Sequence, residues 1–144
     1  MIVRVPQRTQ TDCLICTVAM VMGPYYDYDR VLSDSSRYPK ISSEGKFSAW
    51  WETYLRDEGF ECVYCHFDGL YALGQSGGDV VGIMGMDIPH RASGHVVAVD
   101  KFGVVDPADN APERVAIAEY VHTRLLDGVV FHPEWLAIRK KPAL

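Results

Sequence analysis

The fold is decided by residues 12–24, DCLICTVAMVMGP. Thr11 and Asp12 are N-cap candidates and Gly23-Pro24 is a stop signal, so a helix is expected from about residue 12 to residue 22. The positions between these signals are apolar on nearly every side of such a helix. A helix of this kind belongs in the middle of a core, because a surface helix needs a polar face.

Cys13 lies in the first turn of this helix, and that position favours a reactive thiol. Unpaired backbone N–H groups and the positive end of the helix dipole lower the pKa of a cysteine there. Cys16 is one turn further in and lacks this advantage. The alternative is that Cys13 is a small buried apolar residue, so a partner base is needed to decide.

A second chemical signal lies in residues 93–107, SGHVVAVDKFGVVDP. Two β-branched runs flank Lys101-Phe102, which predicts a hairpin with His95 and Asp106 close together at its open end. Asp106 would then accept from one ring nitrogen of His95 and fix its tautomer. The other nitrogen is left to hold the proton of Cys13.

The alternative without a catalytic role is a histidine on an exposed strand followed by an Asp-Pro turn. Asp100 and Asp109 are the alternatives to Asp106 as the acidic partner of the histidine.

The remaining periodicity predicts an α+β fold in which N-terminal helices pack on an antiparallel sheet, in two layers. Of 144 residues, 48% are hydrophobic and 11% aromatic, which suits one domain over residues 1–144 with one sizeable core. The other expected elements are helices at about 28–35, 46–57 and 113–126, and strands at 60–67, 80–86, 95–99, 104–105 and within 129–138.

Taken in order, these residues resemble the papain-like cysteine peptidases, specifically the bacterial type that removes double-glycine leader peptides and its stand-alone bacterial and phage relatives. The resemblance rests on Gln7, Asp12-Cys13, Ala19-Met20, Gly94-His95 and Val105-Asp106-Pro107. It implies a papain-like fold and a cysteine hydrolase with a triad of Cys13, His95 and Asp106. It also implies an oxyanion hole made by the Gln7 side-chain amide and the Cys13 backbone N–H, with Gln10 as the competing amide.

One departure from the family concerns specificity. The family usually has glycine directly after the cysteine, whereas Leu14 stands there, and a side chain at that point crowds the substrate channel. No transporter or ATPase segment is expected, so secretion-coupled processing is not implied. A peptide or protein substrate is expected, and the bond cleaved is left open among peptide, isopeptide and side-chain amide.

A rival interpretation uses all four cysteines. Cys13-x-x-Cys16 and Cys62-x-x-Cys65 have the pair spacing of a zinc site, with His66 as a spare ligand. However, the first pair lies in an apolar helix, and the second lies in an expected strand, where positions i and i+3 face opposite ways. We therefore expect no metal and no cofactor.

A third interpretation is a catalytically inactive protein-binding module on the same scaffold. The joint presence of Gln7, Cys13, His95 and Asp106 argues against it, because a decayed site should have lost at least one of them.

The charge balance limits the partners. With 19 acidic and 14 basic side chains, the surface offers no general attraction for nucleic acid. The longest uncharged stretch, residues 13–26, is shorter than the roughly 20 residues that cross a bilayer. The N-terminus does not resemble a secretory signal, so a cytoplasmic protein with reduced cysteines is expected. Nothing in the sequence bears on the oligomeric state.

Overall fold

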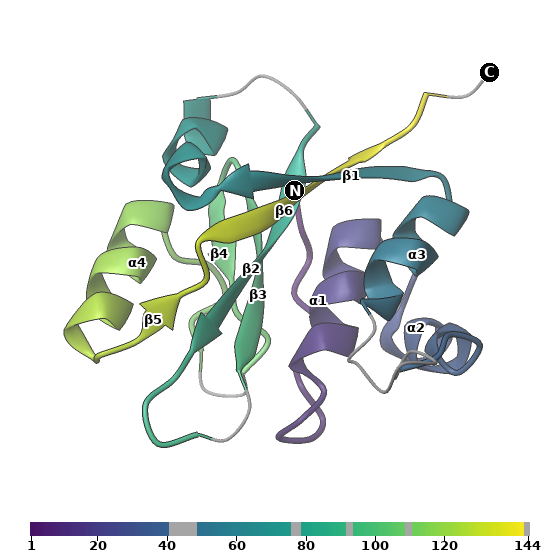
Figure 1. The fold of residues 1–144 in the computed structure, drawn as a ribbon, viewed down its shortest axis with the longest axis horizontal. Coiled ribbons are helices and arrows are strands. Elements are labelled where there is room, and N and C mark those ends of the chain that lie inside the picture. Colours follow the sequence, from purple (N-terminus) through teal and green to yellow (C-terminus); the bar gives the residue numbers. More distant parts are fainter. Residues whose placement is uncertain (41–48, 76–78, 92–93, 109–110, 143–144) are drawn as a thin grey trace.

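The computed structural model describes residues 1–40, 49–75, 79–91, 94–108 and 111–142. They form one antiparallel sheet with helices packed against it (Figure 1). The helices are α1 (Cys13–Met22), α2 (Tyr28–Ser35), α3 (Trp50–Asp57), the 3₁₀ segment η1 (Phe67–Gln75) and α4 (Ile117–Leu126). The strands are β1 (Phe60–His66), β2 (Val81–Asp87), β3 (His95–Asp100), β4 (Gly103–Val105), β5 (Val130–Phe131) and β6 (Glu134–Lys140).

These elements confirm the expected helices and strands, with shifted boundaries. The start of the helix expected at 46–57 lies outside the described residues before position 49, and the helix expected from residue 113 begins at Ile117. The last expected strand is divided into β5 and β6. The segment η1 was not expected from the sequence.

The sheet has the strand order β1-β6-β2-β3-β4, and β5 adds to β2. Helices α1, α2 and α3 cover one face, as expected, while α4 and η1 cover the other (Figure 1). The two-layer expectation therefore omitted a partial third layer. Its cause is that β2 and β3 are apolar on both faces, which requires cover on both sides.

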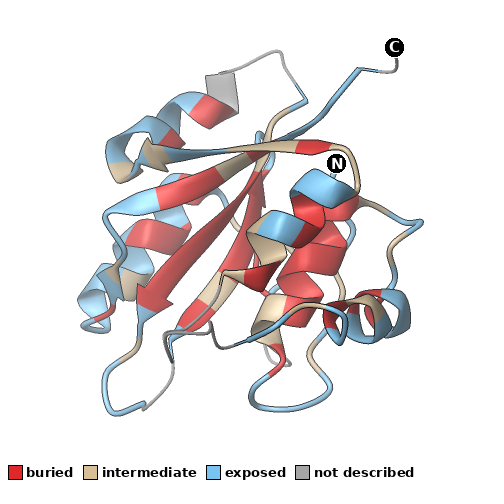
Figure 2. Ribbon diagram, turned by 45° about the vertical axis from the view of Figure 1, so that its right-hand side comes forward, coloured by how far each residue is buried: buried red, intermediate tan, exposed pale blue. Residues whose placement is uncertain are grey.

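Helix α1 forms the centre of the first apolar cluster, as its all-round apolar sequence predicts. Every residue of the helix from Ile15 to Met22 is buried, and Val18 has no exposed surface. The helix ends at Gly23, whose φ of 99° is a conformation that side-chain-bearing residues rarely adopt. In Figure 2 the buried residues run continuously from this helix into the middle strands of the sheet.

The second apolar cluster lies on the other face, between the sheet and α4. Met84 and Met86 of β2 pack there with Val97 and Val99 of β3 and with Tyr120 of α4. The two clusters together leave β3 buried on both sides. The strand that carries His95 is therefore among the most firmly packed parts of the molecule.

Candidate active site

The hairpin of β3 and β4 brings His95 and Asp106 to the same end of the sheet. Ala98 pairs with Val105 and Asp100 with Gly103, so Lys101-Phe102 is the two-residue turn that the sequence predicts. Continuing this register by one residue places Asp106 on the diagonal from His95, on the same face.

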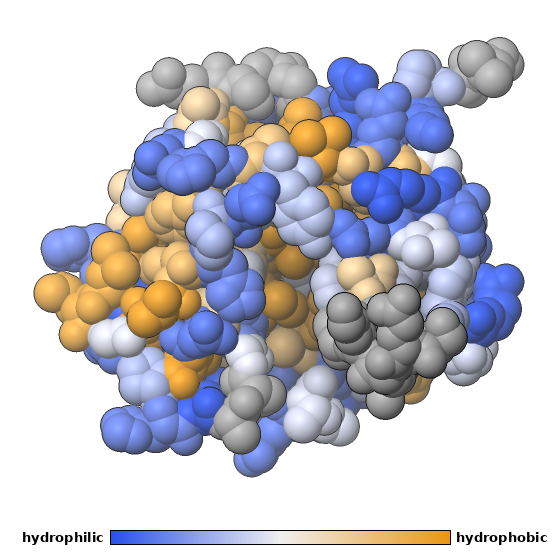
Figure 3. Space-filling view, in the orientation of Figure 1, coloured by the Kyte–Doolittle hydropathy of each residue, from blue (hydrophilic) through white to orange (hydrophobic). Residues whose placement is uncertain are grey.

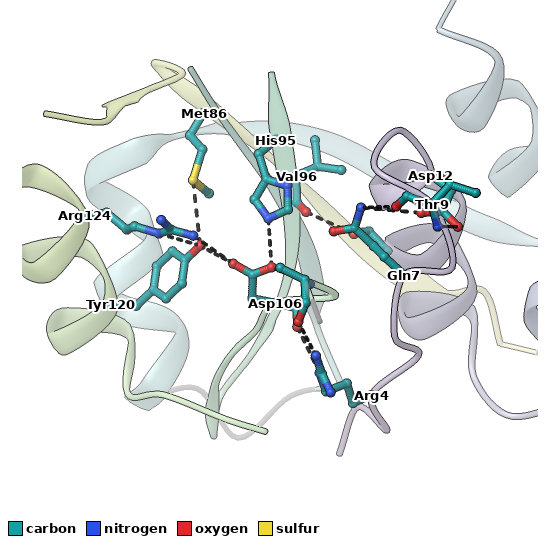
Figure 4. A network of polar contacts seen from close by, with 12 residues as sticks. Arg4, Gln7, Thr9, Asp12, Met86, His95, Val96, Asp106, Tyr120 and Arg124 are labelled. Atoms are coloured by element: carbon teal, nitrogen blue, oxygen red, sulfur yellow. Dashed lines mark hydrogen bonds and ion pairs between the residues drawn. The ribbon is translucent and has the colours of Figure 1, made fainter. Parts of the chain in front are cut away.

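The His95 imidazole is bonded to the Asp106 carboxylate in a buried position. His95 Nε2 lies 2.8 Å from Asp106 Oδ1, and the two residues are only 2% and 3% exposed. The same oxygen accepts from the backbone N–H of Ala108 at 2.9 Å. The other oxygen, Oδ2, accepts from the Tyr120 hydroxyl at 2.8 Å and the Arg124 guanidinium at 3.2 Å (Figure 4). Every acceptor direction of the carboxylate is thus used, and it is held in one orientation.

Tyr120 and Arg124 are site residues that sequence reasoning missed. They stand one turn apart on α4, and the guanidinium also donates to the tyrosine hydroxyl at 3.3 Å. The i, i+4 spacing of the pair within the expected helix was the available signal. Which face of that helix meets the sheet was not evident, because the third layer was not expected.

Three backbone-anchored contacts dock the N-terminal segment and α1 against this hairpin. Thr17 of α1 donates its hydroxyl to the carbonyl of Val96 at 3.3 Å. Arg4 donates to the carbonyl of Asp106 at 3.1 Å, and the Gln7 N–H donates to the carbonyl of Pro107 at 2.7 Å. These contacts on either side of Cys13 bring the first turn of α1 to His95.

Contact between Cys13 and His95 shifts the pKa values of both. Burial by itself raises the pKa of the Cys13 thiol, but hydrogen bonding to His95 and to the backbone of Val96 and Leu14 brings it below its ordinary value. Burial lowers the pKa of His95, yet its bonds to Asp106 and Cys13 raise it to about 9. This combination favours a thiolate and an imidazolium at neutral pH.

The Asp106 carboxylate stays charged in this environment. Burial raises its pKa, but the bonds from His95, the Ala108 N–H and Tyr120 outweigh that effect and lower it to about 2. With Asp106 on Nε2, the other ring nitrogen, Nδ1, is buried and has no hydrogen-bond partner of regular geometry among the described residues. Nδ1 is therefore the ring atom left to exchange a proton with Cys13.

The structure places Gln7 beside Asp12, directly before Cys13. Gln7 Nε2 donates to the carbonyl of Thr9 at 3.1 Å and to Asp12 Oδ1 at 3.4 Å. Asp12 occupies the N-cap position of α1 but makes no side-chain cap, contrary to the usual role of that residue. Its carboxylate instead accepts from the backbone of Arg8 and Thr9 and, at 2.7 Å, from the hydroxyl of Tyr28. Asp12 thus shapes the loop that presents Gln7.

The alternative acidic residues stand differently. Asp100 lies at the turn end of the hairpin, where it accepts from the N–H groups of Ile2 and Phe102 and pairs with Arg114 at 2.8 Å. Asp109 lies outside the described residues. Gln10 is exposed, in the same loop as Gln7.

The four cysteines of the zinc interpretation are free thiols that do not gather into one site. Cys62 packs against the α1 cluster and Cys65 against the α4 cluster, so the two thiols of this pair face opposite sides of the sheet. Cys16 is fully buried and burial raises its pKa to about 12. Within the described ranges, no three His, Cys, Asp or Glu side chains are grouped to hold a metal ion.

Two solved structures share this fold, and both are peptidase domains. The peptidase domain of Streptococcus ComA, a bifunctional ABC transporter of a quorum-sensing pathway, superposes with a TM-score of 0.64 at 17% identity, over 99% of this chain and 100% of that domain. A double-glycine motif protease from an AMS/PCAT transporter, solved with its leader peptide, has a TM-score of 0.60 at 17% identity and covers 98% of this chain and 93% of its own. The expected papain-like α+β fold is thereby confirmed.

Sequence comparison adds no relative to these structures, since no protein-family model matches the chain and no curated protein matches it. In the part of the chain that the structure describes, no helix combines the length and apolar character needed to cross a membrane.

Proposed function

We propose that this chain is a cysteine hydrolase of the peptidase type, in which Cys13 attacks a carbonyl carbon and His95 transfers the protons. The observation that carries the proposal is the state of the imidazole. Asp106 occupies Nε2 at 2.8 Å, and Nδ1 is buried without any other partner of regular geometry among the described residues. An imidazole held in this way is oriented as a proton carrier for the thiol at the head of α1.

The reaction follows from these positions. The Cys13 thiolate adds to the substrate carbonyl, and His95 gives its Nδ1 proton to the leaving amine, which leaves an acyl-enzyme. Water then donates a proton to the same nitrogen and attacks the acyl carbon. Cleavage of the C–S bond releases the carboxylic acid and leaves the Cys13 thiolate beside the His95 imidazolium, which is the starting state. Asp106 keeps its charge throughout and stabilises the imidazolium.

The oxyanion is assigned to the Cys13 backbone N–H and the Gln7 side-chain amide. The Gln7 amide has two N–H groups, and the bond to Asp12 is the longer of its two contacts, at 3.4 Å. Exchange of that long bond for the substrate oxygen costs little, because a contact of this length is weak. Gln7 then stays anchored through Thr9 while it donates to the oxyanion.

The fold supports a peptide as the class of substrate. A neighbour in the same fold was solved with a leader peptide, which supports an extended peptide as the substrate here as well. Leu14, which stands in place of the family's glycine, packs partly against the α1 cluster. Part of the Leu14 side chain is therefore directed into the core, and only the remainder can narrow the substrate channel. Four free cysteines fit activity in the reducing cytoplasm.

Cleavage of a synthetic peptide mixture tests this proposal. Wild-type protein should generate new amino termini, and Cys13→Ser should abolish them, since the serine hydroxyl is not ionised by this histidine. Cys16→Ser is the matched control, because it makes the same atomic change one turn deeper, away from His95. Equal cleavage by the wild type and Cys13→Ser would contradict the assignment of the nucleophile.

A further inference from the structure

A polar cavity of about 460 Å³ adjoins the candidate active site on the side of Gln7. It is lined by Gln7, Arg8, Thr9, Gln10, Arg91 and Ala108. Five of these side chains are hydrogen-bond donors and two of them are cationic, and none of the described residues in this lining is acidic. This part of the surface is thus cationic, although the formal net charge of the chain is −5.

The cavity lies where the three segments of the site converge. Residues 7–10 belong to the loop before Cys13, Arg91 lies in the segment before β3 and its His95, and Ala108 stands two residues after Asp106. The Gln7 N–H bonds to the carbonyl of Pro107 at 2.7 Å, and the Ala108 N–H bonds to Asp106 at 2.9 Å, which holds two of the walls together. A substrate whose carbonyl oxygen meets the Gln7 amide therefore extends along this cavity.

The two arginines of the cavity differ in what they already bind. Arg8 pairs with Asp29 at 2.9 Å and stacks on Tyr28 with its guanidinium 3.9 Å from the ring centre, so its charge is largely engaged. Arg91 is exposed and makes no ion pair with any carboxylate in the described residues. Its backbone is held by a bond from its N–H to the carbonyl of Ile88. The backbone of Arg91 is thus anchored, and its exposed guanidinium is not engaged by any carboxylate of the described residues.

We infer that this cavity is a specificity subsite for an acidic group of the substrate, and that Arg91 is the residue that binds it. The inference rests on the proposed function, because it concerns the substrate of that same site. In an unmodified peptide the anionic groups at neutral pH are carboxylates, and a planar guanidinium binds a carboxylate through two parallel hydrogen bonds. The carboxylate belongs either to an Asp or Glu side chain near the scissile bond or to the peptide's own C-terminus.

A peptide library distinguishes these two sources. Peptides should be compared in sets that differ only in Asp against Asn, Glu against Gln, and a free against an amidated C-terminus, with cleavage measured by mass spectrometry. For the wild type, kcat/KM should be roughly tenfold or more higher for the carboxylate member of at least one pair, in keeping with the discrimination that a charged partner supplies. A side-chain source gives the preference in the Asp and Glu pairs, and a terminal source in the amidation pair.

Reversal of the charge at position 91 tests whether Arg91 causes the preference. Arg91→Glu should remove the preference for the carboxylate member, while Arg139→Gln, an exposed arginine change on β6 away from the cavity, should leave it intact. A wild type that cleaves both members of all three pairs equally, or an Arg91→Glu variant that keeps the preference, would overturn the inference.

Failure of the subsite and failure of the proposed function give different results. Alkylation of Cys13 with neutral iodoacetamide and with anionic iodoacetate at low salt separates them. If Cys13 reacts with both reagents and Arg91→Glu lowers the iodoacetate rate alone by roughly twofold, the charge of the cavity reaches the nucleophile. An unchanged ratio of the two rates counts against the subsite, whereas an unreactive Cys13 counts against the hydrolase itself.

Discussion

The Asp106 carboxylate is the residue on which the candidate site depends, because it joins the histidine to two residues of α4. It accepts from His95 through one oxygen and from Tyr120 and Arg124 through the other. The sequence predicted the first contact from the hairpin register. It did not predict the other two, since they depend on which face of α4 meets the sheet.

Asp106→Asn should lower turnover on the order of 10²–10⁴-fold while the fold persists. The amide is nearly isosteric, but its N–H₂ group, if turned toward His95, favours the tautomer that carries the proton on Nδ1 and removes the charge that stabilises the imidazolium. Steady-state kinetics on a cleaved peptide, with far-UV circular dichroism as the check on folding, measure this. An unchanged rate would remove Asp106 from the site.

Tyr120→Phe should act through Asp106. Loss of a hydrogen bond to a buried carboxylate lowers stability by about 1 kcal/mol or more and raises the pKa of that carboxylate. A more basic carboxylate holds the His95 imidazolium more strongly, so the alkaline limb of the pH–rate profile should move to higher pH. Tyr25→Phe, at a residue that is 85% exposed, is the control that should change neither property. A loss of stability without movement of the alkaline limb would show that Tyr120 is only structural.

Turnover should persist from neutral into alkaline pH before it is lost. The pKa of His95 is raised from 6.5 to about 9, so the imidazolium that protonates the leaving amine persists through neutral pH and is lost above about pH 9. Because Cys13 and His95 titrate as a coupled pair, the two limbs belong to the pair and not to either residue. A loss of kcat as the pH rises, with its midpoint near pH 6.5, would contradict the raised pKa of His95.

At the scale of elements, the site depends on how α1 docks on the β3–β4 hairpin. The sequence predicted each element separately, because α1 has clear start and stop signals and the hairpin has a two-residue turn. The contacts that join them, from Thr17 to Val96 and from Gln7 to Pro107, connect residues far apart in the chain. No local pattern encodes such contacts, so their existence could be inferred only through the family resemblance.

Close packing between β2 and β6 supports the strand that neighbours His95. A Cβ atom added at Gly82 would lie 2.5 Å from the ring of Trp135, which is buried and anchored by its own bond to the carbonyl of His66 at 3.1 Å. Gly82→Ala should therefore reduce the free energy of unfolding by about 1–3 kcal/mol in a urea titration. Gly69→Ala, whose Cβ would meet the same ring no closer than 4.0 Å, should stay within about 0.5 kcal/mol of the wild type. Equal stability of the two variants would show that Trp135 moves freely.

At the scale of the whole molecule, the fold class could be predicted from the sequence, but the third layer and the exposed apolar residues could not. Apolar periodicity and the ordered set from Gln7 to Asp106 were sufficient to predict a papain-like α+β fold, which the two peptidase structures confirm. The third layer was not expected, because η1 has no regular period and the apolar face of α4 is narrow. Figure 3 shows an apolar patch over α4 and β5, where Leu125, Leu126 and Val130 are exposed, and the sequence alone does not separate such residues from the core.

The reactivity of the four thiols tests the central claim most directly. After brief treatment with iodoacetamide at neutral pH, peptide mapping should find Cys13 labelled first, because its thiol pKa is lowered while burial raises that of Cys16 and Cys62. His95→Ala should slow this labelling strongly, since an exposed helix terminus alone is worth about 0.3–1 kcal/mol, less than one pKa unit. Faster labelling of Cys62 or Cys65, or an unchanged rate in His95→Ala, would contradict the assignment of Cys13 and His95 as nucleophile and base.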